Sequence, residues 1–282
     1  MWNQVLSEVS QTIQLGGCPT VLFDVDGTIL YDGLELDSIL KDKLITLSSF
    51  CKVALVTGRS IIESYEVLSN ICVNLPCLFL DGALIYDYIE KVPLRSDVME
   101  QIEFSSIINS CCQYAYIFFE WEDKLYATKH IEPAVFAAEF RYPRNKIIIS
   151  KTPPDKFNRI YFRWFDDDHK EEAINMIKSL CIKPAIFEIK SENWSYINRR
   201  YDKLEGYIYL AEQKAIDPKQ TIYFGDGEND KSLLKYVNWG VSVSSSHINA
   251  IENSRCVLQD HGNAGIIKAV EDLISLFIKI GS

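Results

Sequence analysis

The carboxylates Asp24 and Asp26 come directly after a short apolar run at 19–23 and are one residue apart. Side chains at positions i and i+2 can face the same side where a strand runs out, so both carboxylates can enter one pocket. Two close carboxylates repel each other unless a cation or a shared proton resolves the conflict. A divalent cation would do so, and an all-oxygen ligand set suits Mg²⁺. The alternative is that both residues only shape a turn at Gly27.

A second acidic segment, GDGEND at 225–230, follows another apolar run at 221–224. Its spacing does not match the G-x-G-x-x-G loop that binds dinucleotides, nor the ligand register of an EF-hand loop. Two interpretations remain open. The segment is either an acidic site at the end of a strand or a glycine turn with an Asn or Asp helix cap.

Two further segments could bind an anion. Thr57-Gly58-Arg59 ends the apolar run at 52–56, and a hydroxyl with free N–H groups at a strand–helix junction suits an anion. The alternative is a plain threonine N-cap. Lys203 opens another expected helix, where a lysine is unfavourably placed against the helix dipole. An exposed lysine is the usual explanation, and a neighbouring phosphate would explain this position better.

The elements that carry these residues alternate between strand and helix along both ends of the chain. Such alternation predicts right-handed crossovers and a parallel sheet. Ligands of an open α/β sheet bind outside the carboxyl ends of the strands, which is where both acidic segments stand. The expected strands are 19–24, 52–56, 77–80, 221–224, 240–243 and 256–258, and the expected helices are 36–47, 60–69, 202–213, 229–236 and 266–277.

The middle of the chain differs because aromatic residues crowd its apolar runs, a composition typical of antiparallel strands. The expected strands here are 115–121 and 159–165, and the expected helices are 97–112 and 169–180. The composition changes at Asp81-Gly82 and again at 198–201. We therefore predict an α/β protein whose parallel core, 1–82 and 199–282, is interrupted by an inserted α+β domain, 83–198.

Charge and composition limit the classes of function. The chain has 29 basic and 39 acidic residues, a net charge of −10, whereas nucleic-acid binding needs a basic surface. No apolar run reaches the ~18–20 residues that span a bilayer. The first 17 residues lack the basic cluster of a signal peptide. We expect a cytoplasmic monomer or small homo-oligomer with no nucleic-acid or membrane partner.

Taken in order, DVDGT at 24–28, VTGR at 56–59, Lys203 and GDGEND at 225–230 resemble the motifs of the haloacid dehalogenase superfamily. The end of the chain, around 249–250 and 260–265, is similar to the Cof-type sugar-phosphatase branch, which carries a large α/β cap. The resemblance implies a Rossmann-like parallel core with an inserted α+β cap domain. It also implies a small phosphorylated metabolite as the substrate and Mg²⁺ as the cofactor.

The resemblance also implies a role for each matching residue. Asp24 would be the nucleophile that forms an aspartyl-phosphate, and Asp26 would be the general acid and base. The Mg²⁺ ligands would be the Asp24 carboxylate, the Asp26 backbone carbonyl and the Asp226 carboxylate. Asn229 and Asp230 would position metal-bound water. The phosphoryl oxygens would be bound by Thr57, Gly58 and Lys203.

Two positions depart from the family pattern. Leu204 follows the phosphate lysine where glycine is usual, and Asp81-Gly82 stands where Asn-Gly is usual. Within the cap, aromatic and polar side chains could contact a sugar, although for each of them core packing or solvent exposure is the alternative. These cap candidates are Glu120, Trp121, Arg141, Arg163 and Trp164.

We predict a Mg²⁺-dependent phosphatase of small phosphorylated metabolites, with sugar phosphates as the expected class. Asp26 favours phosphatase or phosphomutase chemistry, because the dehalogenases and ion-pumping ATPases of the superfamily lack an acid at this position. A phosphomutase on the same fold is the first alternative, and release of inorganic phosphate distinguishes the two. A catalytically inactive binding or regulatory protein is the second alternative, which the presence of all four motif residues disfavours.

Overall fold

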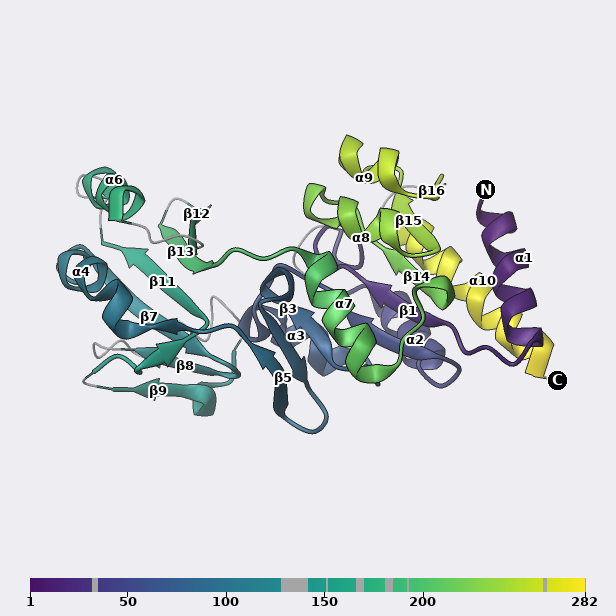
Figure 1. Ribbon diagram of the computed structural model, residues 1–282, viewed down its shortest axis with the longest axis horizontal. Helices are drawn as coiled ribbons and strands as arrows, with labels where there is room; N and C mark the ends of the chain where they lie inside the picture. The colour runs from purple at the N-terminus through teal and green to yellow at the C-terminus, as the bar shows by residue number, and fades with distance from the viewer. Residues whose placement is uncertain are drawn as a thin grey trace. The chain divides into compact units, whose positions relative to one another are not determined.

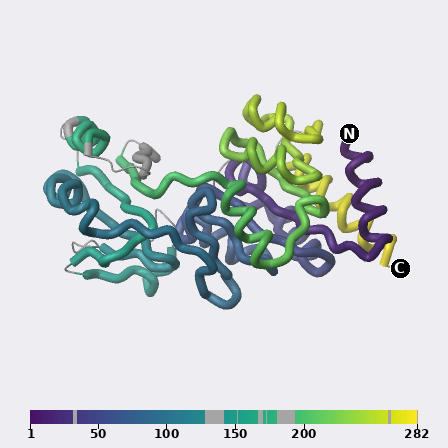
Figure 2. The backbone as a smooth tube through the Cα atoms, in the orientation of Figure 1, coloured from purple at the N-terminus to yellow at the C-terminus, as the bar shows by residue number. Residues whose placement is uncertain are grey.

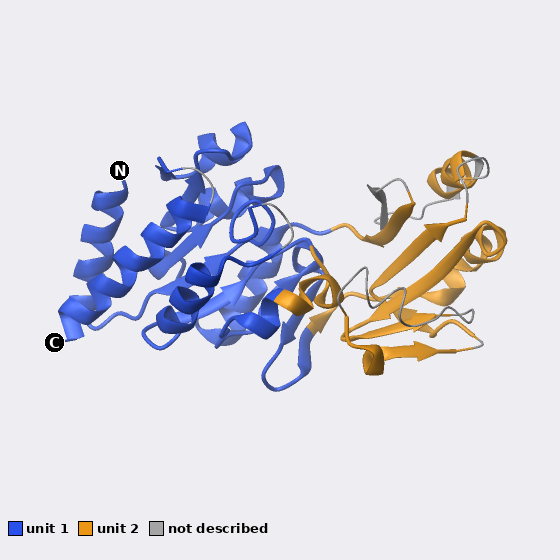
Figure 3. Ribbon diagram, turned by 180° about the vertical axis from the view of Figure 1, so that it is seen from behind, with its two compact units in different colours: residues 1–58, 67–94, 201–282 blue, residues 59–66, 95–200 orange. Residues whose placement is uncertain are grey.

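The computed structural model describes residues 1–31, 35–127, 142–150, 152–165, 170–180, 185–191, 193–260 and 263–281. They form two compact units, the first made of residues 1–58, 67–94 and 201–282 and the second of 59–66 and 95–200 (Figure 3). Figure 2 traces the backbone from the amino to the carboxyl terminus. The predicted insert spans 83–198. The structure instead groups residues 83–94 with the first unit and residues 59–66 with the second.

The first unit is centred on a parallel sheet with the strand order β16-β15-β14-β1-β2 (Figure 1). These strands are β1 (Thr20–Phe23), β2 (Lys52–Leu55), β14 (Thr221–Phe224), β15 (Trp239–Val243) and β16 (Cys256–Leu258). Phe23 pairs with Phe224 on one side and with Leu55 on the other. The carboxyl ends of β1, β2 and β14 therefore reach the same edge of the sheet.

Helices cover both faces of this sheet. The step from β1 to β2 and the step from β14 to β15 run in opposite directions along it, so right-handed crossovers place their helices on opposite faces. These connecting helices are α2 and α8. Helix α10 packs against α1 and α2, and α8 packs against α7 and α9 (Figure 1). The helices are α1 (Trp2–Gln14), α2 (Ser38–Leu47), α7 (Lys203–Lys214), α8 (Lys231–Tyr236), α9 (Ile248–Asn253) and α10 (Asn263–Gly281).

A parallel bridge between Leu78 and Val56 links the third predicted strand, β3 (Cys77–Phe79), to the end of β2 in the parallel sheet. It then pairs antiparallel with β4 (Leu84–Asp87), which stands next to β5 (Val92–Ser96). The turn from β3 to β4 is a short 3₁₀ segment, η1 (Leu80–Gly82). Neither this hairpin nor α1 is among the elements predicted from the sequence.

The second unit holds a six-stranded sheet in the order β12-β13-β11-β7-β8-β9 (Figure 1). Its members are β7 (Ala115–Trp121), β8 (Lys124–Ala127), β9 (Ile147–Ile149), β11 (Arg159–Trp164), β12 (Ala185–Ser191) and β13 (Trp194–Arg199). A two-stranded pair, β6 (Met99–Glu100) and β10 (Lys156–Phe157), accompanies it. The helices of this unit are α4 (Gln101–Cys111), α6 (Lys170–Leu180) and the first part of α3 (Ile61–Asn70).

Alternation along the strands separates the two faces of this sheet. Ile117, Phe119 and Phe162 share an apolar cluster with side chains of α4 and α6. Phe118 and Tyr161 point the other way and form a second cluster. The predicted α/β class is confirmed. Among the helices of the described ranges, none combines the length and apolar character that crossing a membrane requires.

Candidate active site

The site begins at Asp24, the first residue after the buried strand β1. Its backbone N–H donates to the carbonyl of Phe224 at 2.8 Å, so it is level with the end of β14. Only 5% of Asp24 is exposed. A carboxylate buried at this depth needs partners, because burying an isolated charge is costly.

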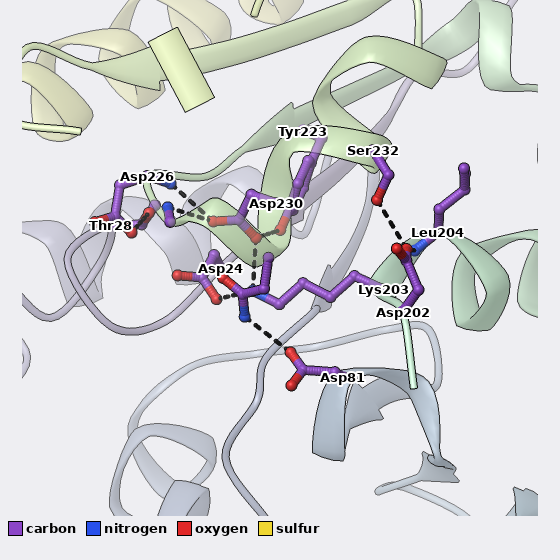
Figure 4. Close-up of polar contacts among 12 residues, drawn as sticks. Asp24, Thr28, Asp81, Asp202, Lys203, Leu204, Tyr223, Asp226, Asp230 and Ser232 are labelled. Atoms are coloured by element: carbon purple, nitrogen blue, oxygen red, sulfur yellow. Dashed lines mark hydrogen bonds and ion pairs between the residues drawn. The ribbon is translucent and has the colours of Figure 1, made fainter. Parts of the chain in front are cut away.

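Lys203, the first residue of α7, is the main partner. Its ammonium donates to Asp24 Oδ1 at 2.7 Å and to Asp230 Oδ1 at 2.6 Å (Figure 4). Burial lowers the pKa of Lys203, but Asp230 and Asp24 raise it more, so the net shift is upward. The unfavourable position of this lysine at a helix start is thus explained by two carboxylates. Its neighbour Leu204 donates its backbone N–H to the N-cap carboxylate of Asp202 at 2.7 Å.

Asp230 is fully buried and fixes the backbone of the loop after β14. Its Oδ2 accepts from the backbone N–H groups of Asp226 at 2.9 Å and of Gly227 at 2.8 Å. The hydroxyl of Tyr223 donates to the other oxygen, which also receives Lys203 (Figure 4). Asp230 therefore fixes both the lysine and the loop.

The two acidic loops touch at Gly27 and Asp226. Thr28 Oγ1 donates to Asp226 Oδ1 at 3.2 Å (Figure 4). Gly27 has a φ of +74°, and a Cβ added to it would lie 2.1 Å from Asp226 Oδ2. Only glycine can therefore occupy this position without displacing the Asp226 carboxylate.

Replacing Gly27 with alanine is expected to lower activity at least about 100-fold and to destabilise the fold by about 1–3 kcal/mol, through strain and displacement of Asp226. The matched control is Gly16→Ala, because Gly16 has a similar φ of +83° with nothing within 4 Å of an added Cβ. Steady-state kinetics and urea unfolding of both variants give the comparison. Equal activity losses in the two would show that the contact with Asp226 is unimportant.

Three carboxylates are brought together at this edge of the sheet. One oxygen each of Asp24, Asp226 and Asp230 lies within 4.8 Å of the others. Burial raises the pKa of Asp24 well above its usual range, and the like charges of Asp230 and Asp226 add to this while Lys203 opposes it. Burial and Asp230 also raise the pKa of Asp226. This donor set fits a hard divalent cation such as Mg²⁺, and Asp24 and Asp226 fit it better than Asp230, whose oxygens already accept four hydrogen bonds.

Mg²⁺ affinity is expected to weaken as the pH falls from about 8 to about 5, because protons and the cation compete for Asp24 and Asp226. The raised pKa of Asp24 means that its contribution to stability in the metal-free protein is lost as the pH rises through that pKa. Stabilisation of the fold by Mg²⁺ should therefore grow as the pH rises from about 5 to about 8. Titration calorimetry in buffers of different ionisation enthalpy measures the protons released. An affinity that does not change with pH would contradict this arrangement.

Asp26 is placed differently from its neighbour. It is exposed, makes a backbone bridge with Leu30, and is not one of the three clustered carboxylates. The structure therefore does not bring both members of the predicted pair, Asp24 and Asp26, into one carboxylate cluster. The chain leaves β1 at Asp24 and turns at Gly27, so the strand alternation assumed for the pair ends between them.

The predicted anion-binding segment lies beside the same edge. Thr57 is fully buried, and its N–H donates to Leu78 O at 2.9 Å. Its carbonyl accepts from the N–H of Asp81 at 3.1 Å, and Asp81 Oδ1 accepts from Asn229 Nδ2 at 2.9 Å. Asp81 and Tyr223 are site residues that the sequence reasoning missed. For Asp81 the available signal was its position directly after the third strand.

The cap candidates separate according to the face of the sheet. Glu120 is fully buried, accepts from Tyr161 OH at 2.8 Å, and has its pKa raised to about 7 by burial. Trp164 is a core residue on the helix-covered face and donates to Ser195 Oγ at 3.0 Å. The remaining candidates are Trp121, which is exposed, Arg163, which lies 5.7 Å from the Trp194 ring, and Arg141, which is outside the described residues.

A family model for haloacid dehalogenase-like hydrolases matches residues 21–270. A Mycoplasma genitalium protein provisionally described as a phosphatase is 22% identical over 266 residues, covering 87% of this chain and 95% of its own length.

Two solved structures show the same fold. A haloacid dehalogenase-like hydrolase from Bacteroides thetaiotaomicron has a TM-score of 0.71 at 18% identity and covers 90% of this chain and 98% of its own. A HAD/COF-like hydrolase from Plasmodium vivax has a TM-score of 0.69 at 20% identity and covers 94% and 99%. The predicted resemblance is thereby confirmed: the chain belongs to the haloacid dehalogenase-like hydrolase family, and its fold is that of the Cof-type branch.

Proposed function

We propose that this hydrolase is a phosphatase that uses Mg²⁺ and acts on small phosphorylated metabolites, with sugar phosphates as the expected class. The observation that carries the proposal is the buried Asp24, held at a strand end by Lys203 beside the carboxylate of Asp226. The phosphatase description of the Mycoplasma genitalium relative supports a phosphate ester as the substrate.

The chemistry assigns one bond change to each step. The Asp24 carboxylate attacks phosphorus, the bond from phosphorus to the ester oxygen breaks, and an aspartyl-phosphate forms. Asp26 donates a proton to the departing oxygen, so that an alcohol leaves. Asp26 then takes a proton from water, whose oxygen attacks the phosphoryl group and releases Asp24 and inorganic phosphate. The exposed position of Asp26 suits a group that exchanges protons with incoming and leaving molecules.

The remaining residues bind and orient. Lys203 keeps its charge and places it next to Asp24, while Thr57 and Gly58 offer a hydroxyl and N–H groups to the phosphoryl oxygens. Mg²⁺, bound by the carboxylates of Asp24 and Asp226 and the backbone carbonyl of Asp26, would offset the negative charge of nucleophile and phosphate.

The loop after β14 supplies two supporting residues to the proposed site. Asn229 and Asp230 would position metal-bound water, and the hydrogen bonds of Asp230 add the role of fixing Lys203. Among the cap candidates, the buried acid Glu120 and the cation Arg163 are retained as proposed substrate contacts, together with the exposed Trp121. The core position of Trp164 favours a structural role.

The test is release of inorganic phosphate from a panel of sugar phosphates and nucleotides, with and without Mg²⁺. Release that requires Mg²⁺ would support the proposal and rank the substrates. Formation of a stable phosphoprotein without phosphate release, followed by transfer to a second sugar hydroxyl, would favour a phosphomutase. A folded protein that neither releases nor retains phosphate from any of these compounds would contradict the proposed function.

A further inference from the structure

Asp81 belongs to none of the four sequence motifs, but it lies beside the proposed anion-binding residues Thr57 and Gly58. Its carboxylate accepts from Asn229 Nδ2, and its N–H donates to the carbonyl of Thr57 (Figure 4 shows its side chain beside Lys203). A Cβ added to Gly58 would lie 3.1 Å from Asp81 Oδ1. The carboxylate is therefore in direct reach of the segment proposed to bind phosphoryl oxygens.

The backbone around Asp81 is strained in a way that holds this side chain in place. Leu80, Asp81 and Gly82 have φ angles of +54°, +55° and +99° in succession. A left-handed conformation is unfavourable for a residue other than glycine, and such strain persists where the surrounding structure imposes it, typically at functional sites.

Helix α7 packs against the turn at 80–82 and supports its left-handed backbone. A Cβ on Gly82 would lie 2.8 Å from the Cα of Gly206, so the turn and the helix that begins at Lys203 are in backbone contact. Asp81 and Lys203 are thus carried by two segments that are in backbone contact. The charge of Asp81 accordingly joins Asp230 and Asp24 in raising the pKa of Lys203 against the effect of burial.

The carboxylate of Asp81 repels a phosphoryl anion that Thr57, Gly58 and Lys203 would bind. Coulomb repulsion is proportional to the charge of the bound group, so a doubly charged phosphoryl group is penalised about twice as much as a singly charged one on the free-energy scale. An asparagine would make the same hydrogen bond to Asn229 without this repulsion, since its side-chain oxygen is also an acceptor.

We propose that Asp81 is a specificity-determining residue that makes the phosphoryl site discriminate by charge, disfavouring doubly charged anions relative to singly charged ones. The inference rests on the proposed function, because it takes Thr57, Gly58 and Lys203 as the phosphoryl-binding groups. Its consequence is that Asp81 shifts the binding preference of the site toward the singly charged form of a phosphoryl group.

The test compares the wild-type protein with Asp81→Asn, an isosteric change that the left-handed backbone accepts, since asparagine adopts this conformation readily. The probes are sulfate and perchlorate, which share a tetrahedral shape and differ by one charge, and inorganic phosphate. Dissociation constants are measured by calorimetry or by competition with phosphate, with and without Mg²⁺. We expect the variant to bind perchlorate about threefold and sulfate about tenfold more tightly, with both gains shrinking at high salt.

Two controls separate charge from structure. Asp217→Asn makes the same change of net charge at an N-cap on the opposite, amino-terminal side of β14, and it should leave all three affinities unchanged. Asp81→Ala removes both the charge and the acceptor, so it should share the gain for sulfate but lose activity through a misplaced Asn229.

Several outcomes would overturn the inference. These are unchanged sulfate affinity in Asp81→Asn, equal gains for sulfate and perchlorate, and a gain of the same size in Asp217→Asn. A wild-type protein that hydrolyses phosphate esters while Asp81→Asn binds sulfate no more tightly would leave the proposed function standing and refute the role of Asp81. If the protein hydrolysed no ester but Asp81→Asn still bound sulfate more tightly, the proposed function would be refuted and the role of Asp81 in anion binding would stand.

Discussion

Replacing Asp24 with asparagine is expected to abolish turnover, with a fall in kcat on the order of 10⁴-fold or more. The amide keeps the shape of the side chain and an acceptor for Lys203, but it cannot attack phosphorus to form the acyl phosphate. The variant should remain folded, because burial already favours the uncharged form of Asp24. Phosphate release under saturating Mg²⁺ gives the rate, and circular dichroism reports the fold.

The same variant is the control for contaminating phosphatases, since it passes through an identical purification. Mild acid quenching of the wild-type protein with radiolabelled substrate should trap label on the chain, and Asp24→Asn should trap none. Near-normal, Mg²⁺-dependent turnover by the variant would rule out Asp24 as the nucleophile.

Replacing Lys203 with methionine is expected to cost both activity and stability. Methionine keeps much of the volume but removes the only cation shown to contact Asp24 and Asp230 among the described residues. Breaking a buried ion pair typically costs about 3–5 kcal/mol, since it leaves buried charge unpaired. The loss of a charge beside the transferred phosphoryl group should lower kcat by about 10²–10³-fold.

The matched control is Lys43→Met, in which the lost ion pair with Glu271, at 3.2 Å, is exposed. Exposed pairs contribute about 0–1 kcal/mol, so this variant should unfold close to the wild-type urea midpoint and keep its activity. Unfolding curves of both variants, recorded without Mg²⁺, measure the difference. If Lys203→Met were as stable as Lys43→Met, the buried contacts of Lys203 would not matter to the fold.

The sequence was sufficient to predict the parallel core because its signals are local. Each buried strand is a short apolar run, and each acidic or hydroxyl-bearing segment directly follows such a run, so parallel topology alone gathers them at one edge. Strand alternation does not describe the chain where it turns sharply after β1. Asp26 is three residues beyond the end of β1, next to the left-handed Gly27, and alternation does not describe the backbone there.

Features that depend on contacts between residues distant in sequence could not be predicted from the sequence alone. The close approach of Gly82 and Gly206 places Asp81 beside Lys203, and neither glycine signals this by itself. Likewise, the pairing of Glu120 with Arg159 is needed to show that Glu120 and Trp164 occupy opposite faces of the sheet, and only the positions of α4 and α6 show which face is the apolar core.

The pairing of β1 with β14 also bears on how the protein is made. Strand β1 ends at Phe23 and its partner begins at Thr221, so almost 200 residues must be synthesised before the central pair can form. At about 5–20 residues per second this takes roughly 10–40 s. During that time β1, which is fully buried in the folded protein, lacks its final neighbour, so we expect the nascent amino-terminal segment to bind chaperones. The central sheet of the catalytic unit is therefore not expected to form before α7 and β14 emerge from the ribosome, and β15, β16 and α10 join it later still.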